Sequence, residues 1–145
     1  QLAEHAVLAF FIPLIGAMGG NVGVQSSSIV VQSLASNTLG FDSTFRRIAK
    51  EFAIALLNGL VCAALIFGYN YFFSDSFALT VTVSFSLFVV IVFASVFGTF
   101  VPLMLHKTGA DPAYATGPFI TTINDILGLL IYMLTGHFMF NLFPV

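Results

Sequence analysis

FALTVTVSFSLFVVIVFASVFGTFVPLML, residues 77–105, is an unbroken run without a charged side chain. One segment of it, LTVTVSFSLF, alternates between apolar and hydroxylated residues as a half-buried strand would. The whole run is nevertheless long enough to cross a hydrocarbon core about 30 Å thick as a helix, which takes ~20 residues. A lone strand leaves its backbone groups unpaired in lipid, whereas a helix pairs them internally. The run therefore predicts a membrane-spanning helix.

Three further apolar runs predict an all-α, polytopic membrane helix bundle with four transmembrane helices. These runs are expected to cover about Ala6–Leu34, Phe52–Phe73 and Pro112–Phe140, with Asp111 as the N-cap of the last helix. Only 7% of the residues are charged, 59% are hydrophobic and the mean hydropathy is +1.04. A soluble domain carries roughly a quarter charged residues, so the composition indicates an integral membrane protein.

All four Lys and Arg residues fall in two predicted connections on the same side of the bundle. Arg46, Arg47 and Lys50 lie between the first two helices, and Lys107 lies between the last two. By the positive-inside rule, this side is cytoplasmic, and both ends of the chain face outward from the cell (inner or plasma) membrane. Four crossings that start outside also predict a further helix upstream in the full-length gene product.

Several classes of function lack support in the sequence. It contains no Ser–His–Asp set, Walker loop or pair of catalytic carboxylates at a plausible depth, which favours a role other than an enzyme. The absence of a basic surface with stacking aromatics argues against nucleic-acid binding. Cys62 is the single cysteine, so an intramolecular disulfide is impossible and a soft transition-metal site is poorly supported.

Polar and small side chains on the first and last helices follow helical spacing. One face of the first helix carries Asn21, Gln25, Ser28 and Gln32. The adjoining face carries Gly16, Gly20, Gly23 and Ser27. A stripe on the last helix consists of Gly117, Thr121, Asp125, Gly128 and Tyr132. Small residues are typical of close helix packing, whereas the amide stripe favours a water-lined path.

Asp125 lies inside the apolar run GPFITTINDILGLLIY, residues 117–132, about 20 Å along a helix that starts at Pro112. It could be a protonated structural acid or half of an ion pair with a segment outside this chain. The favoured role is a carboxylate that faces a hydrated path for cations or protons. Oxygen ligands suit hard cations such as Mg²⁺, whose retained water shell needs only one or two carboxylates. A symmetric homodimer would supply two.

Two motifs resemble the membrane domain of the MgtE magnesium channels: PLIGAMGGNVGVQSS, residues 13–27, and DPAYATGPFITTINDILGLLIY, residues 111–132. The resemblance implies a homodimer with the ion path on its two-fold axis and five transmembrane helices per subunit. Residues 1–145 would form the pore domain without its first helix. The resemblance also implies a cytoplasmic Mg²⁺-sensing region, with an N-terminal domain, paired CBS domains and a connecting helix, which this sequence lacks.

The same resemblance implies a role for particular residues. Asp125 would hold hydrated Mg²⁺ in the pore, and Asp111 would bind Mg²⁺ at the cytoplasmic end. The residues expected to line the pore are Asn21, Gln25, Gly20, Gly117, Thr121, Asn124 and Gly128. The expected function is a magnesium channel pore domain, with Mg²⁺ as transported ion and ligand. The alternatives are a proton- or cation-coupled divalent cation carrier and a non-conducting membrane anchor.

Overall fold

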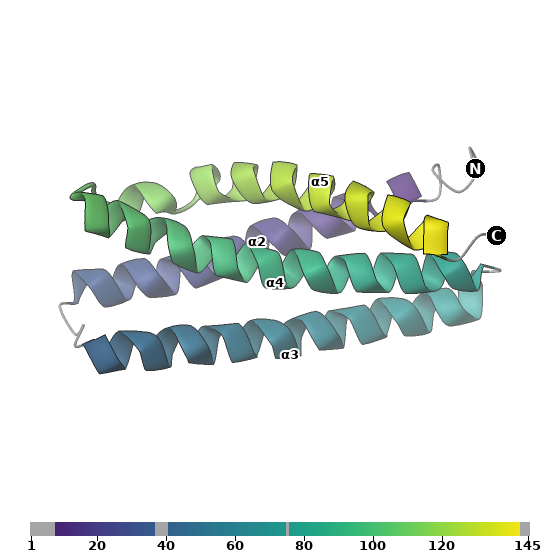
Figure 1. Cartoon of the computed structure of the whole chain (residues 1–145), viewed down its shortest axis with the longest axis horizontal. Coiled ribbons are helices and arrows are strands. Elements are labelled where there is room, and N and C mark those ends of the chain that lie inside the picture. The colour runs from purple at the N-terminus through teal and green to yellow at the C-terminus, as the bar shows by residue number, and fades with distance from the viewer. Residues whose placement is uncertain (1–7, 37–40, 75, 143–145) are drawn as a thin grey trace.

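The computed structural model describes residues 8–36, 41–74 and 76–142, and all regular structure within them is helical (Figure 1). The elements are α2 (Ile12–Ala35), α3 (Phe41–Phe73), α4 (Phe77–Thr108), a short 3₁₀ helix η1 (Pro112–Ala115) and α5 (Pro118–Leu142). Each of the four long helices contains a segment long and apolar enough to cross a membrane. The predicted all-α bundle with four transmembrane helices is therefore confirmed.

The central element is α4, which packs against α2, α3 and α5 (Figure 1). Helices α2 and α4 run in one direction and α3 and α5 in the other, so α2 begins at the end of the bundle where α5 finishes. The membrane segment of α4 is 56% buried and that of α3 only 11%. Because α3 packs chiefly on α4, it is the least buried of the four long helices.

The strand-like alternation at the start of α4 is accommodated within a helix. Ser76 caps α4, since its hydroxyl accepts a hydrogen bond from the Leu79 N–H at 3.3 Å. The hydroxyls of Thr80 and Ser84 donate to the carbonyls four residues earlier, at 3.1 and 2.7 Å. These bonds satisfy polar groups in a helix that lipid or protein surrounds on every side. The helix ends at Gly109, which has φ +81°.

The predicted start of the fourth helix near Pro112 is wrong. Pro112 begins η1 instead, and Asp111 is the N-cap of that short helix, with its Oδ1 accepting from the Ala113 N–H at 2.9 Å. Gly117 then takes φ +57°, a left-handed conformation that interrupts the helix, and α5 begins at Pro118. Asp125 therefore lies about 10 Å along α5, half the expected distance.

The starts of α2 and α3 also differ from the predicted starts, but these differences do not move a site residue. α2 begins at Ile12, after a turn at Phe11, and Pro13 occupies its first turn. The predicted start at Ala6 lies outside the described residues. α3 begins at Phe41, before the apolar run, because the largely polar residues 41–51 are themselves helical.

Candidate functional site

Helices α2 and α5 approach each other at glycines of α2. A Cβ added at Gly20 would lie 3.0 Å from Asp125 Oδ1 and 3.2 Å from Thr121 Cγ2. A Cβ added at Gly23 would overlap the side-chain amide of Asn124. Larger residues at these two positions would displace the α5 side chains that rest there. The small-residue face of α2 is therefore a packing face, and it lets side chains of α5 rest directly on the α2 backbone.

Asp125 lies at the outer edge of this crossing. Its Oδ1 sits over Gly20 and is 3.9 Å from a Cβ built on Gly16, so the carboxylate occupies a notch that these two glycines leave open. The Asp125 side chain is nevertheless exposed on the surface of the single chain. Asn21 and Gln25, on the neighbouring face of α2, are also exposed. A carboxylate and two amides thus lie on the outside of the four-helix unit.

The later part of the predicted α5 stripe, Gly128 and Tyr132, faces inward. Gly128 lies against Val90 of α4, whose Cγ1 would be 3.2 Å from an added Cβ, and both residues are buried. The buried Tyr132 hydroxyl donates to the Leu8 carbonyl at 2.9 Å. Asn124 is also buried, and neither polar atom of its amide has a hydrogen-bond partner among the described residues. The stripe is therefore divided between an outer and an inner side.

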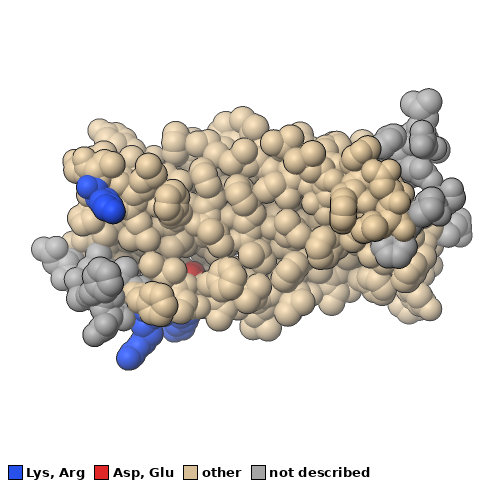
Figure 2. Space-filling model, in the orientation of Figure 1, with Lys and Arg blue, Asp and Glu red and all other residues tan. Residues whose placement is uncertain are grey.

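Asp111 and Gly117 lie away from the crossing, at the end of the bundle where α4 finishes and α5 begins. Asp111 is exposed there, and the Lys and Arg side chains visible in Figure 2 gather at the same end. The buried Ser27 hydroxyl of α2 donates a hydrogen bond to the Ala115 carbonyl and so fixes η1 against α2. The structure thus separates Asp111 from Asp125 and brings Gly20, Thr121 and Asp125 together.

The donor set limits what one chain can bind. Among the described residues, no three His, Cys, Asp or Glu side chains gather closely enough to hold a metal ion. Asp125 is the acidic residue at the crossing, Thr121 lies beside it over Gly20, and Asn21 and Gln25 are exposed amides on the neighbouring face of α2. Such a set can contact the water shell of a hard cation without stripping it.

Sequence reasoning missed one residue that shapes this region. Gly98 of α4 lies against the backbone of Gly23, and an added Cβ would be 3.1 Å from both the Cα and the carbonyl carbon of Gly23. Gly98 therefore sets how closely α4 supports α2 behind the crossing. It belongs to no motif, and a single glycine inside the apolar run was the one signal available.

Comparison with known proteins finds one family whose model matches the chain and several proteins similar to it in sequence. The family model MgtE, described as a divalent cation transporter, matches residues 12–135. The magnesium transporter MgtE of Bacillus subtilis is 39% identical over 131 residues, which are 90% of this chain and 29% of the relative. The magnesium transporter MgtE of Thermus thermophilus is 36% identical over 132 residues, 91% of this chain and 29% of the relative. The chain thus spans about three tenths of the length of these curated relatives.

Proposed function

Because the chain belongs to the MgtE family, we propose that this multi-pass membrane protein is the pore domain of a longer magnesium channel. In this proposal two copies meet on a two-fold axis, and hydrated Mg²⁺ passes between them. The observation that carries the proposal is the position of Asp125. It lies within a membrane-spanning helix, yet it is exposed on the outside of the single chain.

The exposure of the Asp125 carboxylate supports the proposal that a second copy of the chain packs against this surface. Placing an Asp within a membrane helix costs up to about 2.5–3.5 kcal/mol on insertion scales, the value at the helix centre, so such residues normally face protein or water. The cations whose side chains the structure describes are Arg46 and Lys50, near the start of α3, and Lys107, at the end of α4. They do not provide an ion pair at the crossing. If two copies packed together through their α2–α5 faces, Asp125 would be removed from lipid and the two carboxylates would lie opposite each other.

The mechanism is electrostatic. Two carboxylates lower the cost of holding a divalent cation in a low-dielectric membrane. Mg²⁺ loses water reluctantly, so the exposed amides of Asn21 and Gln25 would hydrogen-bond its water shell, as Thr121 would from α5. Contact through water keeps binding loose enough for release, as conduction requires. Gly20 and Gly16 have no side chains, so they leave open the notch on α2 that the Asp125 carboxylate occupies.

The ends of the path follow from the charges. The end that carries Arg46, Lys50 and Lys107 would be cytoplasmic, which puts the start of α2 and the end of α5 outside. Asp111, exposed at the same end, would attract Mg²⁺ at the cytoplasmic mouth. Gly117, Asn124 and Gly128 would shape the path through helix packing, since the last two are buried within the chain.

The test is Mg²⁺ flux into proteoliposomes that contain the full-length protein. Asp125→Asn, which keeps the size of the side chain and removes its charge, should lower flux at least about tenfold. Glu51→Gln is the matched control, because Glu51 is a buried acid on α3, which packs chiefly on α4. It makes the same chemical change on a helix outside the α2–α5 crossing and should leave flux within about twofold of the wild type, because Coulomb energy falls with distance from the ion.

Three outcomes would count against this function. Undiminished flux in a folded Asp125→Asn protein would leave the residue a structural acid and would refute the carboxylate mechanism, whereas no flux from the wild type would favour a membrane anchor. Saturable, pH-coupled flux without single-channel steps would indicate a carrier. Cross-linking in membranes that yields only monomers would remove the second carboxylate on which the mechanism depends.

A further inference from the structure

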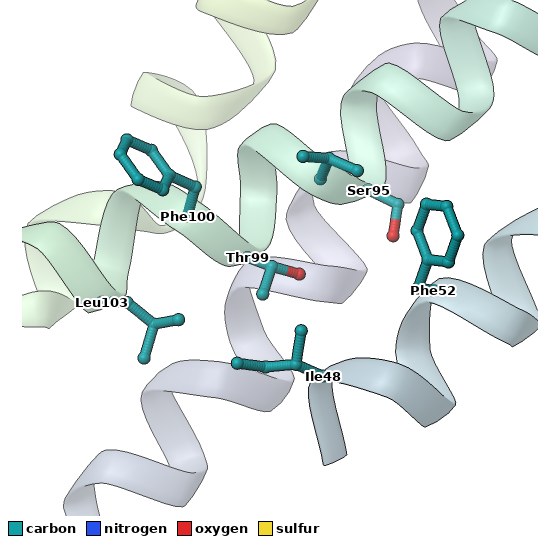
Figure 3. Close-up of a pocket in the computed structure, with 7 residues that line it drawn as sticks. Ile48, Phe52, Ser95, Thr99, Phe100 and Leu103 are labelled. Carbon is teal, nitrogen blue, oxygen red and sulfur yellow. The ribbon is translucent and has the colours of Figure 1, made fainter. Parts of the chain in front are cut away.

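A cavity of about 270 Å³ lies between α3 and α4, on a part of the chain that the proposed ion path does not use (Figure 3). Ile48 and Phe52 line it from α3, and Val96, Thr99 and Leu103 are among the residues that line it from α4. This volume is several times the ~30 Å³ that one water occupies in the liquid.

The walls of this α3–α4 cavity are apolar, and its rim is open. The Phe52, Val96 and Phe100 side chains are all exposed, so the cavity opens onto the outer surface of α3 and α4. At its inner end, the Ser95 hydroxyl is buried and hydrogen-bonded to that of Ser26 at 3.0 Å. An apolar cavity of this kind stays dry and accepts apolar ligands. Because the rim faces the hydrocarbon in a membrane-spanning bundle, a lipid acyl chain is the apolar group at hand.

Charge indicates which lipid fits. Lys107 follows Leu103 by four residues on α4, so it lies on the same face, one turn nearer the end of the bundle. Arg46 and Lys50, near the start of α3, are also exposed, and α3 begins at the end of the bundle where α4 finishes (Figure 1). The buried Glu51 is not among the residues that line the cavity. Basic groups above a gap between membrane helices attract anionic headgroups.

We propose that the α3–α4 cavity binds one acyl chain of an anionic phospholipid, whose phosphate pairs with Lys107 at the rim. The lipid fills the space between α4 and its least buried neighbour, α3, and so holds α3 in place. The proposal requires only that the chain spans a membrane, and it stands or fails separately from Mg²⁺ conduction.

The test uses the full-length protein in nanodiscs that contain a phosphatidylglycerol with a photoactivatable group in its acyl chain. Illumination followed by mass spectrometry should locate lipid adducts on residues of the α3–α4 cavity. Val96→Trp, which fills the rim, should abolish these adducts. Val61→Trp is the matched control: Val61 is 50% exposed on α3 and Val96 is 48% exposed on α4, but Val61 does not line the cavity. Its adducts should equal those of the wild type.

A competition experiment tests the headgroup. Unlabelled phosphatidylglycerol should displace the probe better than phosphatidylcholine does, and Lys107→Gln should reduce this preference about fivefold, whereas Lys107→Arg should retain it. Equal labelling in Val96→Trp and Val61→Trp would overturn the proposal. So would equal competition by the two lipids, or a photoactivatable residue at position 96 that cross-links to another segment of the protein instead of to lipid.

Discussion

Replacing Gly98 by alanine should destabilise the bundle, because α4 approaches the backbone of α2 at this residue. An added Cβ would overlap the carbonyl oxygen of Gly23 and would lie 3.1 Å from both its Cα and its carbonyl carbon, whereas ordinary contacts begin at 3.4 Å. Helical backbone atoms cannot rotate away as a side chain can, so α2 and α4 must separate. Overpacking of this kind costs about 1–3 kcal/mol, which the higher helix propensity of alanine offsets by about 1 kcal/mol.

Gly68→Ala is the matched control for this prediction. Gly68 lies within α3, and among the described residues no atom would come within 4 Å of its added Cβ. Both variants gain the same helix propensity, so their free energies of unfolding should differ by the overpacking cost alone, about 1–3 kcal/mol. Unfolding by sodium dodecyl sulfate, followed through thiol labelling of the partly buried Cys62, measures this difference. If Gly98→Ala is as stable as Gly68→Ala, the close approach of α2 and α4 is refuted.

Two further changes test other contacts by the same unfolding titration. Tyr132→Phe removes the buried hydrogen bond to the Leu8 carbonyl and should lower the free energy of unfolding by about 1 kcal/mol; an unchanged midpoint would mean that the bond does not form. Gly117→Ala forces a side chain into a left-handed conformation and should cost about 1–2 kcal/mol. Gly117→Asn should cost less, because Asn tolerates that conformation, and the reverse order would contradict the assigned backbone.

The four helices could be predicted because lipid removes most alternatives. Apolar runs of this length have few structures available to them in a membrane, so the alternation in residues 79–88 did not mislead the assignment. The start of α5 could not be predicted in the same way. Pro112 after Asp111 and Pro118 after Gly117 are both proper helix starts. The choice between them depends on contacts such as that of Ser27 with Ala115, which join residues far apart in the sequence.

The sequence also could not predict that the α5 stripe is divided between an outer and an inner side. Helices commonly pack along rows of residues four apart, and such rows are inclined to the helix axis. The buried row of α5 is Ile120, Asn124, Gly128, Tyr132 and Gly136. Asp125 and Tyr132 appear on one face by spacing, yet the inclined row includes Tyr132 and excludes Asp125. The crossing geometry of α5 against α2 and α4 decides this, and no single helix encodes it.

The exposure of Asp125 also decides which substitution can separate conduction from folding. Within the part of the chain that the structure describes, its carboxylate makes no hydrogen bond that holds the bundle together. Asn124, one residue earlier, is buried against Gly23, so changing it would alter packing and any ion path at once. Asp125→Asn should therefore leave the unfolding midpoint of the single chain nearly unchanged. A loss of Mg²⁺ flux in that variant can then be attributed to the missing charge, because the fold does not depend on it.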